Sequence, residues 1–506
     1  MGNKQESLAR PTALLTLVGI VSQVLAFFYR VALSRMVGAE LLGVQQIVLQ
    51  VYAVLQSIAL TGLTSAVSSL SAGYHALKNQ RAATQLLNLS VKTFLALWLP
   101  LAGAILLYAD EISTILLDDR RTRMGLLLLL PLLLLTGIEN LNKHHFYGLR
   151  ESALPAAVEL MEQFIRTAAI LGLLALFLPL DGEHTVALIF LGMLVSEIFS
   201  SITLPLLRRR REGPPNLQPG HLEPGGELER QILKIALPVS ATAILDNLIE
   251  AVNSILIPRE LVSYGLTAAG AMELYGVVFG MTLPMLMLPF AFVRALSLTL
   301  LPQITGCAAT GRLRELNHTA DRAIFMTTVI LLPVTALLVT IGQDLGLMLF
   351  RDPRAGQYLI PLAAVTSLLG VEAVMAAILN GIGKQAQSAM VSLLCGMVQL
   401  AFTVFGVARW GLAAYVVGMI VSGVTGLVTR FRLVRRATGF QPDLFCCFWG
   451  PGLAALLSGL CSNLFYQVLV DSGYGMLLSV SVCGVFCFLL YLLTLHVMGV
   501  RLRERA

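Results

Sequence analysis

Long apolar stretches recur along the whole chain, separated by short polar segments. A window of roughly 20 apolar residues is long enough to cross the hydrocarbon core of a bilayer as a helix. The approximate ranges of the fourteen expected spans are 12–33, 44–70, 89–109, 124–147, 154–179, 185–206, 231–257, 271–297, 321–341, 358–381, 386–408, 411–431, 447–470 and 474–498. This pattern predicts an all-α polytopic membrane protein with about 14 transmembrane helices.

The polar interruptions divide these helices into groups. The longest loop follows the arginine run 208–211 and is rich in proline and glycine, which predicts an irregular linker. The predicted parts are a six-helix lobe at 1–206, a cytoplasmic linker at 207–230, a second six-helix lobe at 231–433, and helices 13 and 14 with a cytoplasmic tail at 434–506.

The two six-helix lobes show weak similarity. Leu33-Ser-Arg35 closes the first span and Ile257-Pro-Arg259 closes the seventh, and each is followed by glycine and a long span. Breaks are expected in both long spans, at Thr61-Gly62 and at Pro284 and Pro289. Because six crossings return the chain to the same side, such repeats would share one orientation in the membrane.

Composition supports the membrane interpretation and excludes a large soluble domain. The chain is 57% hydrophobic and 13% charged, whereas soluble domains carry roughly 25% charged residues. With the N-terminus inside, 22 of the 35 Lys and Arg residues belong to inner loops if Lys143, Arg322 and Arg430 near the inner span ends are counted with them. Another 8 fall in outer loops and 5 within spans. The positive-inside rule therefore places both termini in the cytoplasm, and the net charge of +6 indicates topology rather than nucleic-acid binding.

Arginines inside apolar spans are the first candidates for function. Arg30 and Arg294 carry permanent charge and a planar fork that suits phosphate oxygens, so they could bind a diphosphate. Arg35, at the outer end of the first span, is a further candidate. Gln46 and Gln50 in the second span could bind sugars. The alternatives are structural pairing of the arginines with glutamates, and glutamines that face interfacial water.

Acidic residues inside spans are the second group of candidates. Asp246 and Glu250 are four residues apart with Asn247 beside them, and two such carboxylates disfavour simultaneous ionisation. They could couple transport to a proton or sodium ion, or belong to a structural hydrogen-bond network. Glu162 and Arg166 have opposite charge at the same spacing, which predicts a structural or gating pair.

Other chemistry finds no support in the sequence. There is no Gly-x4-Gly-Lys-Ser/Thr phosphate loop and no His-Glu-x2-His motif. No outer loop exceeds about 20 residues, the length of one membrane span, which leaves no room for an extracytoplasmic catalytic domain. We therefore expect neither an enzyme with catalytic residues nor a metal site or cofactor, apart from a coupling H⁺ or Na⁺.

Several motifs resemble the stage V sporulation protein B family, in the polysaccharide and lipid II flippase branch of the multidrug/oligosaccharidyl-lipid/polysaccharide (MOP) superfamily. In chain order they are Phe28-Tyr-Arg-Val-Ala-Leu-Ser-Arg-Met-Val-Gly38 with Leu42-Gly43, Leu60-Thr-Gly-Leu-Thr-Ser-Ala-Val-Ser68, Ile235-Ala-Leu-Pro-Val-Ser240 with Ile255-Leu-Ile-Pro-Arg259, Tyr275-Gly-Val-Val-Phe-Gly-Met-Thr-Leu-Pro284 through Pro289 to Leu301-Pro302, and Ile378-Leu-Asn-Gly-Ile-Gly-Lys384. The matches cover nearly the whole chain.

The resemblance implies a MATE-like fold of two pseudo-symmetric six-helix lobes facing each other in a V, with two appended helices. It implies alternating access by a flippase in the bacterial cytoplasmic membrane, or in the forespore outer membrane. The favoured cargo is an undecaprenyl-linked sugar precursor, above all lipid II for spore cortex peptidoglycan. Membrane lipids and cell-wall synthesis enzymes are the implied partners.

Some positions depart from the related vegetative lipid II flippases. Those proteins have an arginine where this chain has Gln23, and an Arg-Asp pair where it has Tyr29-Arg30. Relatives hold sodium with an aspartate matching Asp246, but the nearest polar group in span eleven is Gln399 rather than an acid. The predicted function is flipping from inner to outer leaflet, driven by an ion gradient or membrane potential. The alternatives are a cation-coupled multidrug exporter and a flippase for another lipid-linked polysaccharide unit.

Overall fold

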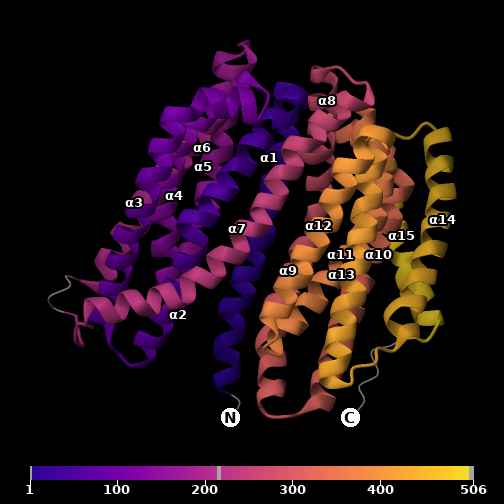
Figure 1. Ribbon diagram of the computed structural model, residues 1–506. Helices are drawn as coiled ribbons and strands as arrows, with labels where there is room; N and C mark the ends of the chain where they lie inside the picture. The colour runs from indigo at the N-terminus through magenta and orange to yellow at the C-terminus, as the bar shows by residue number, and fades with distance from the viewer. Residues whose placement is uncertain (1–2, 214–217, 501–506) are drawn as a thin grey trace. The chain divides into compact units, whose positions relative to one another are not determined.

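The computed structural model describes residues 3–213 and 218–500, and its long elements are all helices (Figure 1). The first helices are α1 (Asn3–Gln56), α2 (Gly62–Ala76), α3 (Gln80–Glu111), α4 (Arg123–Gly148), α5 (Ala153–Phe177), α6 (Gly182–Glu212) and α7 (Gly225–Tyr264). The remaining helices are α8 (Ala268–Tyr275), α9 (Leu283–Ala309), α10 (Leu313–Phe350), α11 (Pro353–Gly381), α12 (Gln385–Trp410), α13 (Leu412–Thr438), α14 (Gly450–Asp471) and α15 (Met476–Val497). The predicted all-α class is confirmed.

Thirteen helical stretches in the described residues are long and apolar enough to cross a membrane, and the first of them, Val21–Ala76, has 56 residues. At 1.5 Å per residue this stretch would measure about 80 Å, more than twice a hydrocarbon core of about 30 Å. The backbone breaks at Gly38, where φ is 79° and ψ is 173°. Counted as two segments about Gly38, this stretch brings the total to the fourteen predicted, in a multi-pass membrane protein.

The expected breaks in the two long spans are present as π-helical turns. One turn covers Ser57–Thr61 and passes into α2 at Gly62. The other covers Gly276–Thr282 and passes into α9 at Leu283. In the second case the break lies before Pro284 rather than at the prolines, because proline is tolerated in the first turn of a new helix.

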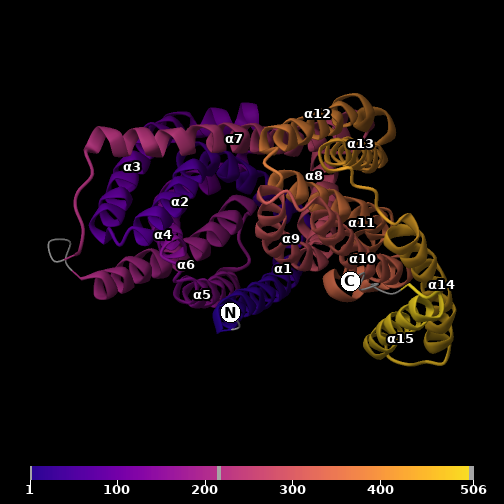
Figure 2. The same ribbon diagram turned by 90° about the horizontal axis from the view of Figure 1, so that it is seen from below.

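The chain divides into two compact units, residues 1–255 and 256–506. In the first unit α4, α5 and α6 lie side by side (Figures 1 and 2). The buried core around Leu63, Phe94 and Leu141 includes Leu228 and Ile232 of α7. Most of α7 therefore completes the first unit, although the sequence places this helix at the start of the second lobe.

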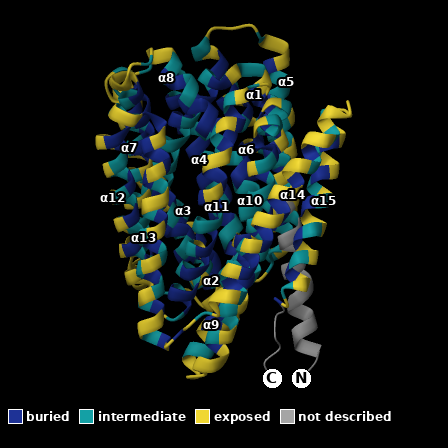
Figure 3. Ribbon diagram, turned by 90° about the vertical axis from the view of Figure 1, so that its right-hand side faces the viewer, coloured by how far each residue is buried: buried dark blue, intermediate teal, exposed yellow. Residues whose placement is uncertain are grey.

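The second unit is built around α10 and α11. Its core contains Ile324 of α10, Met375 of α11, and Ala454 and Tyr491 of the appended helices α14 and α15. Large apolar side chains on α12 to α15 are exposed (Figure 3), as expected for surfaces that face lipid.

A sequence repeat relates the two helix sets. Glu40-Leu-Leu-Gly-Val44 and Glu273-Leu-Tyr-Gly-Val277 match at four of five positions. The same shift along the chain takes the last residue of α2, Ala76, to the last residue of α9, Ala309. It also takes the first residue of α3 to the first residue of α10. This shift confirms the pseudo-symmetry of the two helix sets, but it does not align Leu33-Ser-Arg35 with Ile257-Pro-Arg259, so that expected match was wrong. The V-shaped arrangement stays a prediction.

The region predicted as a linker is irregular but tied to α3. Thr84 Oγ1 donates to Gln218 Oε1 at 2.7 Å, and Gln85 Nε2 donates to the Glu223 carbonyl at 2.8 Å. Helix α6 reaches Glu212 and α7 begins at Gly225, so the segment without helix is shorter than the predicted 207–230. The four-part domain division stays a prediction.

Candidate functional site

The predicted diphosphate- and sugar-binding residues of the first two spans all lie on α1. Arg30 and Arg35 precede the break at Gly38, and Gln46 and Gln50 follow it. Arg35 is exposed, whereas both glutamines are half-buried. Their assignment to a substrate site stays a prediction.

The Arg30 side chain is half-buried in the apolar α1, beside Tyr29, with which it interacts electrostatically. Among the residues that the structure describes, no carboxylate forms an ion pair with it within 4.0 Å. A guanidinium inside a membrane span is costly without a counter-charge. The alternative of a structural glutamate partner for Arg30 therefore finds no support in the described contacts, and its role in binding an anion stays a prediction.

Arg294 lies on α9 in the second unit, where its side chain is exposed. It also has no ion pair among the described residues. Arg30 and Arg294 belong to different units, so their use as successive points on one path stays a prediction.

The predicted ion-coupling residues lie on α7. Asp246 and Glu250 are exposed and interact electrostatically, as their spacing predicts. Asn247 Nδ2 donates to the carbonyl of Ala243 at 2.8 Å, one turn earlier, so its amide is engaged by its own helix. These contacts leave the coupling role of the group a prediction.

The predicted pair of Glu162 and Arg166 is present on α5 as an ion pair, and it belongs to a larger network. Arg166 Nη2 also donates to Glu197 Oε1 of α6 at 3.0 Å. Its Nε donates to Ser196 Oγ at 3.2 Å. One guanidinium thus links two buried carboxylates from neighbouring helices, which the spacing along α5 alone does not reveal.

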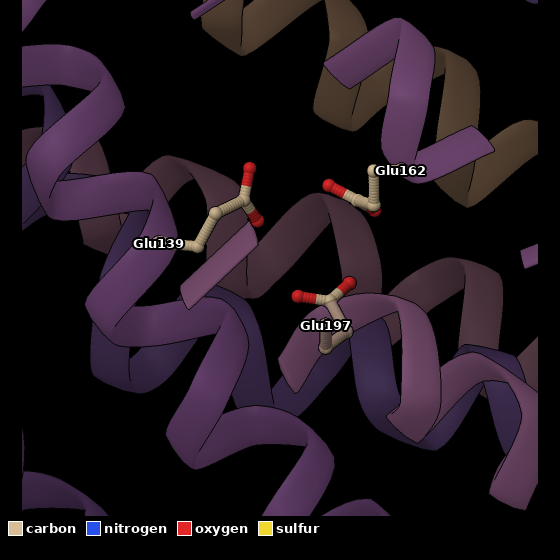
Figure 4. Close-up of side chains that lie close together, drawn as sticks. All are labelled: Glu139, Glu162 and Glu197. Carbon is tan, nitrogen blue, oxygen red and sulfur yellow. The ribbon is translucent and has the colours of Figure 1, made fainter. Parts of the chain in front are cut away.

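A third buried carboxylate joins from α4. Oxygen atoms of Glu139, Glu162 and Glu197 lie within 4.8 Å of one another, and the three side chains point toward one another (Figure 4). The exposed fractions of the three residues are only 4%, 6% and 5%. Lys143 Nζ lies 3.6 Å from Glu139 and 3.0 Å from the more exposed Glu159. We call Glu139, Glu162 and Glu197 the glutamate cluster.

The sequence places these three glutamates inside expected spans, but it does not show that they meet, because they come from three helices. The repeat of the Glu-Leu-x-Gly-Val motif points to one of these glutamates. The shift that takes Glu40 to Glu273 also takes Glu139 to Glu372, a half-buried carboxylate. Comparison of the two halves at this shift would have singled out Glu139 from the sequence.

The equivalent region of the second unit contains a simple ion pair. Glu372 of α11 pairs with Arg430 of α13, whose side chain is 4% exposed. Arg430 Nη2 donates to Ser392 Oγ at 2.7 Å, and Cys395 Sγ lies 3.8 Å from Glu372 Oε1. One carboxylate and one guanidinium neutralise each other there.

Solved structures with the same fold are transporters. The chain is 12% identical to a structure of the lipid II flippase MurJ in an inward closed conformation, covering 97% of this chain and 100% of that one with a TM-score of 0.73. It is 15% identical to an inward-facing multidrug resistance MATE family transporter of the MOP superfamily, covering 83% and 98% with a TM-score of 0.64. These likenesses establish the fold.

Sequence relatives come from Bacillus subtilis (strain 168). Stage V sporulation protein B is 21% identical over 427 residues, 84% of this chain and 82% of the relative. Lipid II flippase MurJ is 22% identical over 461 residues, 86% and 84% of the two chains. These matches confirm the resemblance to the stage V sporulation protein B branch of the MOP superfamily.

The family described as polysaccharide biosynthesis protein matches residues 8–292, which is more than half of the 506 residues. The matched range contains both the Arg30 region of α1 and the glutamate cluster. This chain is therefore a member of the polysaccharide biosynthesis protein family.

Proposed function

We propose that this protein is a flippase that moves an undecaprenyl-diphosphate-linked sugar precursor from the inner to the outer leaflet, with lipid II as the favoured cargo. The observation that carries the proposal is Arg30, a half-buried guanidinium in a membrane span without a carboxylate partner in the described contacts. Family membership and the names of the flippase relatives support it.

Arginine suits this cargo because its planar fork binds phosphate oxygens through two parallel hydrogen bonds. A diphosphate would supply the ion-pair partner that Arg30 does not have among the described contacts. Gln46 and Gln50, after the Gly38 break on the same helix, offer amide donors and acceptors to sugar hydroxyls. Arg35 and Arg294 would meet the diphosphate before or after Arg30.

In this proposal the protein moves its cargo without altering it, so no catalytic residue is assigned. The drive is an ion gradient or the membrane potential, which is worth about 2.3 kcal/mol per charge per 100 mV. Asp246, Asn247 and Glu250 are the candidates for ion coupling on α7. The proposed location is the bacterial cytoplasmic membrane or forespore outer membrane, with both termini cytoplasmic and cell-wall synthesis enzymes as partners.

A cation-coupled exporter of amphiphilic drugs is the second candidate. The structural likeness to MATE transporters and the exposed acids Asp246 and Glu250 favour it. The two candidates differ in what Arg30 does. A cationic drug would be repelled by this guanidinium, whereas a diphosphate would be attracted to it.

The test is reconstitution of the full chain in liposomes that contain lipid II, with a membrane potential, followed by measurement of headgroup exposure on the outer leaflet. We expect protein-dependent exposure that falls at least about tenfold in Arg30→Ala, equivalent to about 1.4 kcal/mol. The matched control is Arg312→Ala, which removes an exposed arginine paired with Glu315.

Two results would contradict the proposal in different ways. If wild-type protein produces no exposure of lipid II above that of empty liposomes, the flippase function is wrong. If Arg30→Ala flips lipid II as fast as wild type, the function stands and the site assignment is wrong. Efflux of a cationic dye in the same liposomes would favour the drug exporter.

A further inference from the structure

The glutamate cluster contains more negative charge than its neighbours neutralise. Three buried carboxylates, Glu139, Glu162 and Glu197, face two cations, Arg166 and Lys143. If all five groups were charged, the buried set would carry one excess negative charge. In a membrane-embedded site an uncompensated charge costs several kcal/mol. Binding of one positive charge at the cluster would remove this cost.

Each of the two cations already pairs with two carboxylates. Arg166 is shared between Glu162 and Glu197, and Lys143 is shared between Glu139 and Glu159. Glu159 is half-exposed and solvated, so the excess of one negative charge refers to the buried set, for which no further described cation is left.

One oxygen in the cluster has no partner. Oε2 of Glu197 is buried and accepts no hydrogen bond from any residue that the structure describes, whereas its Oε1 is bound by Arg166. The polar neighbours of this carboxylate include Thr136 and Glu139. Two carboxyl groups can hydrogen-bond to each other only when one of them carries a proton. A proton on Glu197 or Glu139 would therefore allow a hydrogen bond between these two side chains of α6 and α4.

The remaining groups around the cluster add no cation that pairs with its carboxylates. From α1, Tyr29 interacts with Arg166 and with Arg30, which forms no described ion pair with the cluster. Tyr52, also on α1, interacts with Glu197 and Glu139 while donating to Thr136 Oγ1 at 2.7 Å. From α4, Tyr147 lies beside Lys143.

The second unit provides an internal comparison. The repeat pairs Glu139 with Glu372, Glu159 with Ser392, Glu162 with Cys395, Arg166 with Gln399, and Glu197 with Arg430. At these positions the second unit has one half-buried carboxylate in contact with one buried guanidinium. Two repeats of one helix arrangement therefore differ in charge, and only the first has an excess of carboxylates over cations.

We propose that the glutamate cluster of the first unit binds one exchangeable proton, shared among Glu139, Glu162 and Glu197. The proton comes from water, forms an O–H bond to one carboxylate oxygen, and returns to water when that bond breaks. Proton binding at the cluster does not depend on the transport of any cargo. A role of this proton as the driving ion rests on the proposed flippase function, and it would place ion coupling in the cluster rather than at Asp246 and Glu250.

A proton fits the cluster better than a metal ion does. The Arg166 guanidinium already lies among the carboxylates and would repel a metal cation placed between them. A divalent ion would also exceed the single missing charge. Carboxylates held this close share a proton readily, because two like charges at short range cannot both remain ionised.

The test is infrared difference spectroscopy of the purified full-length protein as the pH is raised from neutral. We expect the C=O band of about one neutral carboxylic acid per molecule, lost at higher pH. Each of Glu139→Gln, Glu162→Gln and Glu197→Gln removes the excess charge and should abolish the band at neutral pH. Glu372→Gln combined with Arg430→Met is the matched control and should leave the band unchanged, since this double variant removes an ion pair and no net charge.

If a variant misfolds, the spectrum of the wild-type protein still tests the proposal. Absence of a titrating carboxylic acid band in wild type would overturn the proposal. A melting temperature raised by sodium chloride but not by choline chloride, with the effect lost in Glu197→Gln, would instead assign the site to sodium and also overturn it. Neither readout requires lipid II, so a failed flipping assay leaves this proposal intact, and the reverse also holds.

Discussion

Arg121 Nη1 donates to Glu40 Oε1 at 2.7 Å, across 81 residues of sequence, and Arg354 of the second unit binds Glu273 across the same 81 residues. Each arginine also pairs with the aspartate two positions before it, and that aspartate accepts a hydrogen bond from the arginine backbone N–H at 2.9 Å. Each unit therefore has a matching ion network that ties the start of α4 or α11 to a distant Glu-Leu-x-Gly-Val motif.

The first prediction concerns this network in the first unit. Glu40→Gln should lower the free energy of unfolding by about 1–2 kcal/mol, because Arg121 loses a partly buried charged partner. The measurement is the thermal unfolding of purified protein. In a double-mutant cycle with Arg121→Met the two effects should be strongly non-additive. Additive effects would show that the contact contributes nothing to stability.

The second prediction concerns pH and the equivalent network in the second unit. Partial burial of Asp352 acts to raise its pKa, but hydrogen bonds from the side chain and backbone of Arg354 outweigh this and hold the pKa below its usual value. A carboxyl whose pKa is depressed in the folded state stabilises the protein above its unfolded pKa of about 3.9, and this contribution is lost as the pH falls through the folded pKa.

We therefore expect Asp352→Asn to lower the melting temperature at neutral pH and to have progressively less effect as the pH drops below about 4. The measurement is the melting temperature of both proteins across this range. An equal difference at all pH values would contradict the assigned role of the Asp352 charge.

The third prediction tests the packing of α7 on α2. A Cβ atom at Gly62 would lie 2.3 Å from the carbonyl oxygen of Ala236, which is backbone and has little room to shift. Gly62→Ala should therefore destabilise the first unit by about 1–3 kcal/mol. Gly73→Ala is the matched control, since Gly73 lies on the same helix and its Cβ would meet nothing within 4 Å. Equal melting temperatures for the two variants would contradict this packing.

The fourth prediction concerns Glu372 and Arg430. Glu372→Gln leaves a buried guanidinium unpaired, and Arg430→Met leaves a half-buried carboxylate unpaired, so either change should cost about 3–5 kcal/mol. The double variant removes both charges and should recover most of the loss. The measurement is thermal unfolding of all four proteins. A double variant less stable than both single variants would show that the region needs its charges for another reason.

Features that act along one segment could be predicted from the sequence. Apolar length identifies the spans, Thr61-Gly62 marks the break before α2, and the four-residue spacing of Glu162 and Arg166 predicts their ion pair. Contacts between helices could not be predicted in this way. Glu197 meets Arg166 only because α5 and α6 pack together, and no local pattern specifies which face of α6 they share.

Packing also explains why the neighbours of α7 could not be predicted from the sequence. The repeat assigns α7 to the second helix set, yet Leu228, Ile232 and Ala236 bury their side chains against α2 and α3. Hydropathy identifies α7 as a span but does not indicate which helices it packs against. The Glu-Leu-x-Gly-Val motif, in contrast, was visible in the sequence and aligns the two halves without any structure.

The position of α7 has a consequence for the synthesis of the protein. Multidomain chains fold largely from the N-terminus as they leave the ribosome. Here the first unit lacks part of its core until the ribosome has passed residue 236, beyond the loop that follows α6. Until α7 is synthesised, the first six helices therefore leave an apolar face of α2 and α3 uncovered in the membrane. Packing of α7 against this face completes the first unit.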